Sequence, residues 1–422
     1  MSIRRRGHLA MVQEPARSAR PHVVVVGAGF AGLNATRVLA RGGARVTLVD
    51  RHPYSTFQPL LYQVATAGLA AGDITYPTRA FAAKYRRARA RRGALTKLHP
   101  AERRVEFDDG TSLDYDYLVL TTGVTTNWYG IEGARENGYP IYSVQDSIVL
   151  RKRLQSLLQQ VAEGKRESAH AVVVGAGATG VEIAGTMAEL RQRTLPVTYP
   201  EIKPDQTSVT LVERFDYVLS PYKPRLRDAA ANALRKRGVH LRLGSTVASV
   251  EPDAVVLSDG TRLPSDVTVW ALGVAAPAEV SNLGLKQGKG GRIEVTQALN
   301  VAAYPEIFVA GDLAGPPNPL PQLAQPAIQM GEHAGRQILA MAHGRPAAPF
   351  SYSDPGIMAT VGRGSAVLQL SNGMTMHGPL AWLAWIGLHL TYLLGGRNRV
   401  SVLVSFLARY AGPRRSAATV VE

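Results

Sequence analysis

Runs of buried-type apolar residues alternate with helical patterns from the start of the chain. The run His22–Val26 is followed by a glycine-rich turn, a helical pattern through Ala40, and a second predicted strand at Arg45–Asp50. Continuous runs of β-branched apolar residues are typical of strands that are buried on both faces of a parallel sheet. The pattern therefore predicts an α/β fold that begins with a strand–helix–strand unit.

The same pattern returns in the middle of the chain. A strand is predicted at Ala171–Val174, a helix through Leu190, and a further strand at Ser208–Glu213. Residues 191–207 separate this helix from its strand and are interpreted as an insertion. The repetition predicts two related units within one chain.

Each copy is followed by a second repeated pattern. Lys97–Gly123 and Ser249–Gly273 both contain a strand, an Asp-Gly-Thr turn, and a later strand that ends in glycine. Asp-Gly between alternating runs is a hairpin signal. We therefore expect a β-meander attached to each strand–helix–strand unit.

The glycine-rich turns have the spacing of dinucleotide-binding loops. Gly27-Ala-Gly-Phe-Ala-Gly32 and Gly175-Ala-Gly-Ala-Thr-Gly180 each lie between a strand and a helix, and Asp50 and Glu213 close the strands that follow. Such glycines permit a tight turn and a close approach of the backbone to a pyrophosphate, and the acidic residue accepts hydrogen bonds from a ribose. The α/β fold is therefore expected to contain two Rossmann-like dinucleotide-binding domains.

Two dinucleotide sites in one chain suggest FAD and a nicotinamide cofactor. The long segment after the first unit and the later strand Ile307–Asp312, which ends in Gly-Asp, favour FAD in the first site. A carboxylate at Glu213 repels a 2′-phosphate and favours NADH over NADPH, although the adjacent Arg214 weakens this argument.

Composition restricts the chemistry further. The chain has 422 residues and no cysteine, which excludes thiol nucleophiles, disulfide reductases and cysteine-bound metal centres, and no metal is expected. Its net charge of +16 indicates anionic partners such as nucleotides or a membrane surface. No nucleic-acid-binding motif accompanies the charge, so no nucleic-acid partner is expected.

The C-terminal region has an interfacial pattern. Leu380–Leu394 is almost wholly apolar but too short to span a bilayer. The next helical pattern places four apolar residues on one face: Val400, Leu403, Val404 and Leu407. We expect an amphipathic membrane-binding region, with a buried helical hairpin or a dimer contact as the alternative.

Two basic segments have simpler explanations. The run Lys84–Arg92 is interpreted as a solvated helix face, although contact with lipid remains an alternative. Residues 1–20 are expected to form a disordered basic tail, since no apolar segment follows Arg4-Arg-Arg6 as a targeting signal requires.

Several motifs resemble those of the type II NADH dehydrogenases, the non-proton-pumping NADH:quinone oxidoreductases, and especially their actinobacterial branch. They are Phe57-Gln-Pro-Leu-Leu-Tyr-Gln-Val-Ala65, Gly175-Ala-Gly-Ala-Thr-Gly-Val-Glu182, Ala324-Gln-Pro-Ala-Ile-Gln329 and the apolar tail Ala381–Val400. The resemblance extends over nearly the whole chain. It implies an enzyme that transfers a hydride from NADH to FAD and then two electrons to a membrane quinone, menaquinone or ubiquinone.

The resemblance also implies site residues. Expected catalytic residues are Glu182, Gln325 and Gln329. Expected FAD contacts are Gly27, Gly29, Phe30, Ala31, Asp50, Arg51, Gln58, Gly123, Gly311, Asp312, Ala324 and Gln325. Expected NADH contacts are Gly175, Gly177, Thr179, Gly180, Glu182, Glu213 and Gly273. Plain structural roles stay open for Gln325, at a helix start, and for Glu182, where an acid suits the helix dipole.

Five segments follow from this interpretation. They are the tail 1–20, FAD-binding parts 21–140 and 285–346, an NADH-binding domain 141–284, and a membrane-association domain 347–422. The resemblance implies a homodimer that is peripheral to the cytoplasmic face of the cell membrane and binds anionic lipid. The alternative is a soluble NADH-dependent flavoprotein reductase that delivers electrons to a ferredoxin or to oxygen.

Overall fold

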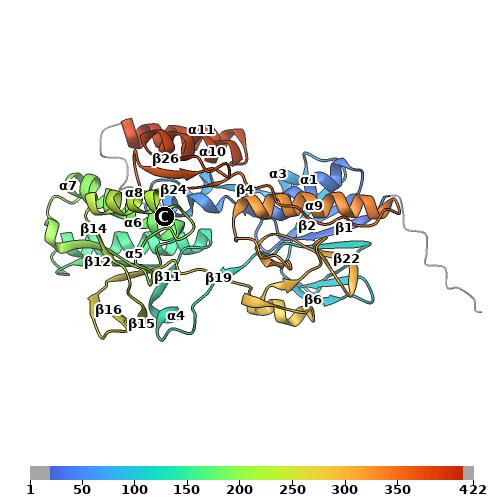
Figure 1. The fold of residues 1–422 in the computed structure, drawn as a ribbon, viewed down its shortest axis with the longest axis horizontal. Coiled ribbons are helices and arrows are strands. Elements are labelled where there is room, and N and C mark those ends of the chain that lie inside the picture. Colours follow the sequence, from blue (N-terminus) through green and yellow to red (C-terminus); the bar gives the residue numbers. More distant parts are fainter. Residues whose placement is uncertain (1–19, 412–422) are drawn as a thin grey trace, which may run out of the picture. The chain divides into compact units, whose positions relative to one another are not determined.

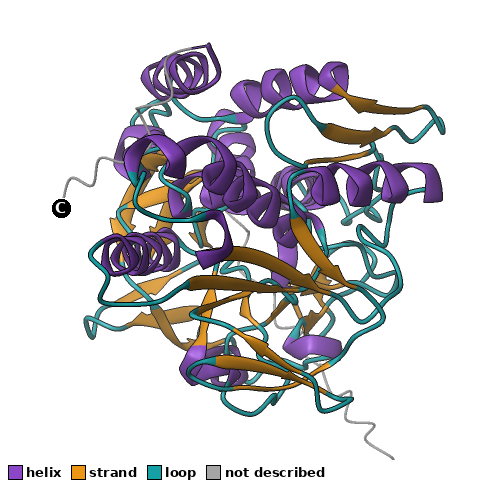
Figure 2. Cartoon of the chain, turned by 90° about the vertical axis from the view of Figure 1, so that its left-hand side faces the viewer, coloured by secondary structure: helices purple, strands orange, loops and turns teal. Residues whose placement is uncertain are grey.

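The computed structural model describes residues 20–411 of the chain (Figure 1). The basic tail expected over residues 1–20 therefore lies, except for Arg20, outside the described residues. Helices and strands alternate through the chain (Figure 2), which confirms the α/β class. The chain forms two compact units. Among the described residues, the first comprises 20–51, Ala82–Thr121 and Glu294–Phe350, and the second comprises His52–Phe81, Thr122–Ile293 and 351–411.

The first unit is built on a six-stranded sheet in the order β21-β22-β9-β1-β2-β5. The strands are β1 (His22–Val26), β2 (Arg45–Asp50), β5 (Ala88–Arg92), β9 (Tyr117–Leu120), β21 (Asn300–Val301) and β22 (Tyr304–Val309). All pairs are parallel except β21 with β22. Helices α1 (Phe30–Arg41) and α9 (Ala324–Ala342) pack together, and β23 (Ala314–Gly315) lies between β22 and α9 in the chain.

Glycines permit the close approach of these two helices. A side chain at Gly331 of α9 would collide with the backbone of Ala31 on α1, and one at Gly335 would press on Val38. The first predicted meander is also present, as the antiparallel sheet β6 (Leu95–His99), β7 (Arg104–Phe107) and β8 (Ser112–Asp114).

The prediction of a helix at Lys84–Arg92 is wrong. Its second half is strand β5, which pairs with β2 from Val46↔Ala88 to Asp50↔Arg92 and forms the edge of the sheet. The alternation Ala-Arg-Ala-Arg has the period of a strand, with small residues on one face and long cations on the other. Because the run contains so many cations, its alternation of small and long side chains was not recognised in the sequence.

The second unit contains the second parallel sheet, in the order β11-β18-β12-β13-β14. Its strands are β11 (Gly138–Pro140), β12 (Ala169–Val174), β13 (Thr207–Val212), β14 (Val239–Arg242) and β18 (Val267–Trp270). The helices around it are α4 (Ala134–Asn137), α5 (Val144–Ala162), α6 (Ala178–Glu189), α7 (Leu195–Thr198) and α8 (Pro224–Lys236). The expected insertion holds a π-helical turn, Leu190–Thr194, and α7.

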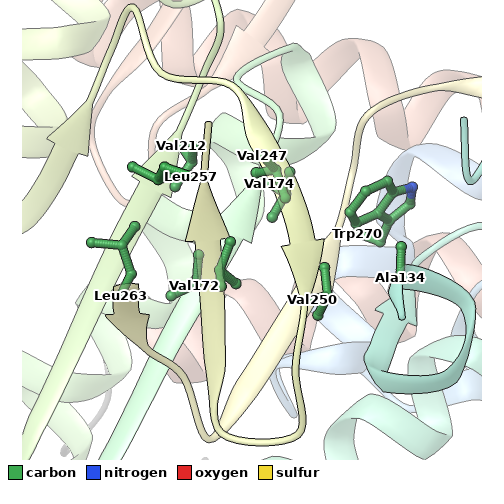
Figure 3. Close-up of a cluster of buried hydrophobic side chains, with 10 residues drawn as sticks. Ala134, Val172, Val174, Val212, Val247, Val250, Leu257, Leu263 and Trp270 are labelled. Atoms are coloured by element: carbon green, nitrogen blue, oxygen red, sulfur yellow. The ribbon is translucent and has the colours of Figure 1, made fainter. Parts of the chain in front are cut away.

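The second meander packs against one face of this sheet. It consists of β15 (Val247–Val250), β16 (Ala254–Leu257) and β17 (Arg262–Pro264). Figure 3 shows its inward side chains, such as Val250 and Leu263, packed with Val172 and Trp270 of the parallel sheet. Trp128 also packs here, with its ring centroid 5.7 Å from that of Trp270.

The last part of the second unit is a sheet and two helices (Figure 1). The antiparallel sheet contains β24 (Ile357–Thr360), β25 (Ala366–Gln369) and β26 (Thr375–Gly378), followed by α10 (Pro379–Tyr392) and α11 (Gly396–Ala411). The unit also holds β3 (Tyr54–Thr56), α2 (Leu61–Ala65), β4 (Thr75–Pro77), β10 (Thr125–Thr126) and β19 (Val274–Ala275). Helix α3 (Thr78–Ala82) and β20 (Ile293–Glu294) cross the boundary between the units.

Candidate functional site

The first glycine-rich turn leaves the start of α1 open to a ligand. Gly27 has a φ of 106°, and Gly29 is the N-cap of α1 without a side-chain hydrogen bond to the helix. The Asp50 Oδ2 at the end of β2 accepts a hydrogen bond of 2.6 Å from the Ala28 amide. Uncapped amides at a helix N-terminus, beside a fixed carboxylate, suit a pyrophosphate and its ribose.

The second turn reproduces this geometry in the second unit. Gly175 has a φ of 102°, Gly177 is the N-cap of α6 without a side-chain cap, and Glu213 Oε2 accepts 2.7 Å from the Ala176 amide. A side chain at Gly180 would collide with the Gly175 carbonyl, as one at Gly32 would with that of Gly27. The structure thus brings the glycines and the acid of each predicted site together.

Further predicted FAD contacts meet after β22 in the first unit. Gly311 has a φ of 75° and lies against Ala31 of α1, within the turn Gly311–Leu313 that also holds Asp312. Gln322 Nε2 donates to the Asp312 carbonyl oxygen at 3.2 Å. The turn is thereby tied to the start of α9, where Ala324 and Gln325 lie in the first turn.

The other expected FAD and NADH contacts differ in exposure and in the unit to which they belong. Arg51 is exposed in the first unit, where its carbonyl accepts from Arg92 Nε at 3.1 Å. Gln58 and Gly123 belong to the second unit and are half-buried. The remaining expected contacts are Phe30 at the first position of α1, Thr179 exposed in the first turn of α6, Gln329 on α9 and Gly273 with a φ of 133° before β19.

Among these residues, Glu182 is the acid whose pKa departs most from its usual value. It is buried on α6, and burial raises the pKa of its carboxyl from 4.5 to about 8. The Thr360 amide donates to Glu182 Oε1 at 3.3 Å and partly opposes this rise. The Trp385 indole has the same opposing effect on the pKa, although its Nε1 makes no well-aligned hydrogen bond. At neutral pH the carboxyl of Glu182 therefore retains its proton.

An aromatic cluster joins Glu182 to the C-terminal helices. Trp385 of α10 stacks on His389 with ring centroids 4.0 Å apart, and it also packs near Tyr62 of α2 and Phe406 of α11, each at 6.4 Å. His389 meets Phe57 edge-on at 6.0 Å, and burial lowers its pKa to about 4. His389 is thus packed against aromatic rings and neutral.

Sequence reasoning missed a polar connection beside this cluster. Arg409 Nη1 of α11 donates to Gln63 Oε1 of α2 at 2.9 Å, and its Nε lies 4.0 Å from Glu189 Oε1 of α6. A side chain at Gly68 would collide with Arg409 and Gln63. These residues are up to 346 positions apart, so no local pattern relates them.

The site geometry agrees with comparisons to known proteins. A family model described as pyridine nucleotide-disulphide oxidoreductase matches residues 21–331. Two type II NADH:quinone oxidoreductases of Mycobacterium tuberculosis are each 35% identical to the chain, over 97% and 96% of it and 93% and 91% of the relatives. The chain belongs to the type II NADH:quinone oxidoreductase family. The family inferred from the motifs is thereby confirmed.

Solved structures show the same fold at lower identity. NDH2 from Plasmodium falciparum in complex with NADH has a TM-score of 0.85 and 17% identity, covering 93% of this chain and 99% of that one. The sulfide:quinone oxidoreductase of Aquifex aeolicus has a TM-score of 0.76 and 18% identity, with 93% and 95% covered. At these identities the likeness shows the fold alone.

The C-terminal helices of this family member each have a buried and an exposed apolar face. Trp385, Val402 and Phe406 are buried. The exposed apolar residues are Leu380, Leu383, Leu388, Tyr392, Val400, Leu403, Val404 and Leu407. The four residues expected to share one face of α11 are all among them, which confirms that prediction. Between residues 20 and 411, no helix has the length and apolar character needed to cross a bilayer.

Proposed function

We propose that the chain oxidises NADH with bound FAD and passes two electrons to a membrane quinone. The observation that carries the proposal is the repeated hydrogen bond from a glycine-loop amide to the acid after the next strand, Ala28 to Asp50 and Ala176 to Glu213. It supports two dinucleotide sites in one chain of this family. The absence of cysteine leaves a flavin-to-quinone route without a thiol intermediate.

The residues of the first unit fit FAD. The uncapped amides of α1 would hold the pyrophosphate, Asp50 would accept from the adenosine ribose, and Asp312 would contact the ribityl chain. When bound, FAD supplies a ring that accepts a hydride from NADH and gives two electrons to a quinone. In the second unit, α6 and Glu213 would hold the NADH pyrophosphate and ribose in the same way.

Two further groups are assigned roles in the reaction. Glu182 would position the nicotinamide or hold a proton for relay at its carboxyl, since its raised pKa keeps it neutral. Gln325, and with it Gln329, would donate side-chain amide hydrogen bonds to the quinone oxygens. Both glutamines lie on α9, four residues apart and therefore on one helix face.

The exposed faces of α10 and α11 favour a membrane-bound acceptor over a soluble ferredoxin or oxygen. Exposed leucines and valines gathered on two consecutive helices are costly in water and suit the boundary between lipid headgroups and acyl chains. Arg397 and Arg399 flank this face at the start of α11 and would meet anionic headgroups. We propose peripheral attachment to the cytoplasmic face of the membrane, as a homodimer.

The test is anaerobic reduction of the FAD-loaded protein. NADH should bleach the flavin absorbance, and a menaquinone or ubiquinone analogue should restore it. Asp50→Ala should lose FAD, whereas Glu213→Ala should keep FAD and bind NADH more weakly. A protein that cannot be loaded with FAD would refute the proposal, and the reverse pattern of the two variants would exchange the two sites.

A further inference from the structure

A four-residue turn in the second unit holds a tyrosine in a backbone conformation that aromatic residues rarely adopt. The turn is closed by the Ile131 amide, which donates to the Trp128 carbonyl at 3.1 Å. Its two central residues, Tyr129 and Gly130, have positive φ angles of 53° and 67°. Asn, Asp and Gly dominate such positions, because a bulky side chain is strained there. A tyrosine at the first central position therefore lowers the stability of the turn.

The Tyr129 side chain does not offset this strain by burial. Tyr129 is 59% exposed. Its Oη donates to the Leu272 carbonyl oxygen at 3.5 Å, which is long for a hydrogen bond and stabilises little. Residues in sparsely populated backbone regions cluster at ligand sites, where the conformation serves binding instead of stability. A strained and exposed aromatic ring therefore indicates a ligand contact.

Short contacts place this ring beside the second glycine-rich turn. The Asn127 amide donates to the Gly273 carbonyl at 3.0 Å, and a Cβ at Gly273 would lie 3.0 Å from Tyr129 Oη. A Cβ at Gly175 would lie 3.1 Å from the Leu272 Cα. Tyr129 and the glycine-rich turn thus contact the same two-residue segment, which follows the carboxyl end of β18.

The strand order indicates which half of a dinucleotide would reach Tyr129. Strand β12, which leads into the glycine-rich turn, lies between β13 and β18. Glu213, directly after β13, is proposed to hold the ribose of the adenosine half. A dinucleotide crosses the carboxyl edge of such a sheet with its pyrophosphate over the glycine-rich turn. The other half therefore extends toward the end of β18, where Tyr129 lies.

We propose that the Tyr129 ring forms a wall of the pocket for the nicotinamide nucleoside half of NADH. The ring would pack against the ribose and the nicotinamide, and the contact of its Oη with the Leu272 carbonyl would orient it. The inference rests on the proposed NADH site and adds a binding residue on its nicotinamide side.

The experiment measures the dissociation constants of NAD⁺ and ADP for the FAD-loaded, oxidised protein. Neither ligand reduces the flavin, and ADP lacks the nicotinamide nucleoside. Tyr129→Asn should weaken NAD⁺ binding about three- to tenfold, as expected for the loss of an aromatic contact, and leave ADP binding unchanged. Tyr129→Phe, which keeps the ring, should bind both ligands nearly as the wild type does. Glu213→Ala, on the adenosine side, is the matched control and should weaken both ligands alike.

Thermal unfolding separates a binding role from a structural one. Tyr129→Asn and Tyr129→Gly should unfold at or above the wild-type temperature, because both residues tolerate a positive φ. A lower unfolding temperature in both variants would mean that the ring stabilises the fold, and would overturn this inference. Equal weakening of both ligands, or unchanged NAD⁺ binding by Tyr129→Asn, would also overturn this inference alone. Wild-type protein that binds neither ligand would overturn the proposed function and this inference with it.

Discussion

The Glu182 carboxyl group on α6 accepts a hydrogen bond of 3.3 Å from the backbone amide of Thr360 on β24, 178 residues later in the chain. Apart from this bond and the nearby Trp385 indole, burial dominates its environment, and the pKa of Glu182 is raised from 4.5 to about 8. The folded protein therefore holds a proton that the unfolded chain releases at a lower pH.

This relation predicts a loss of stability with rising pH. Between the two pKa values the folded state binds more protons, so the Glu182 contribution is complete below about pH 4.5 and is lost as the pH rises through about 8. The full difference is at most about 5 kcal/mol. Glu182→Gln should abolish this part of the pH dependence in thermal unfolding between about pH 6 and 9.

The control is an acid outside this environment. Glu163 is exposed at the surface and its hydrogen bond with Lys165 lowers its pKa, so Glu163→Gln should keep the wild-type slope over the same range. An identical slope in wild type and Glu182→Gln would mean that the Glu182 carboxyl ionises normally. The proton-holding role assigned to it would then be withdrawn.

A Gly→Ala substitution should destabilise the protein in α9 and stabilise it in α10. Gly331→Ala places a Cβ against the Ala31 backbone where α1 and α9 meet, and such overpacking costs about 1–3 kcal/mol. Gly387→Ala in α10 meets nothing within 4 Å and should gain up to about 1 kcal/mol from helix propensity. Calorimetry of the two variants measures both effects, and a Gly331→Ala protein as stable as the wild type would contradict the close contact at Gly331.

Local patterns predicted much of the fold. Strands β1 and β2 have the predicted bounds, and the acids Asp50 and Glu213 lie within hydrogen-bonding distance of the glycine loops. These features depend on neighbouring residues or on one strand–helix–strand unit, where periodicity and turn chemistry decide the structure.

Long-range features were not predictable from local patterns. Thr360 and Trp385 modify Glu182 only because β24 and α10 return to α6, and Arg409 reaches Gln63 across most of the chain. The strand at Ala88–Arg92 was missed for a different reason. Pairing with β2 gives its backbone partners, and this tertiary pairing outweighs the helix suggested by a run of cations.

Arg409 should hold the end of α11 against the rest of the second unit. Its side chain is only 10% exposed and contacts Gln63 and Glu189, so Arg409→Ala leaves buried polar atoms without their partner. We expect faster amide hydrogen exchange in α11 and α2 of this variant. Arg397→Ala, which removes an exposed cation from the same helix, should leave the exchange of α2 unchanged, and equal effects would show that the Arg409 contacts contribute nothing.

The exposed face of α11 should determine attachment to lipid. Leu403 and Leu407 are 41% and 57% exposed and lie four residues apart, on one face of the helix. Replacing both with glutamate should lower partitioning into anionic vesicles about tenfold or more, because apolar burial is lost and like charge is added. Cosedimentation with vesicles measures this partitioning directly.

The control is Val149→Glu, at an exposed apolar position on α5, which should partition like the wild type. Reduction of a water-soluble acceptor by NADH should be unaffected in the double variant, while reduction of a quinone held in vesicles should fall with the bound fraction. Unchanged partitioning would instead favour a contact between protein chains on this face.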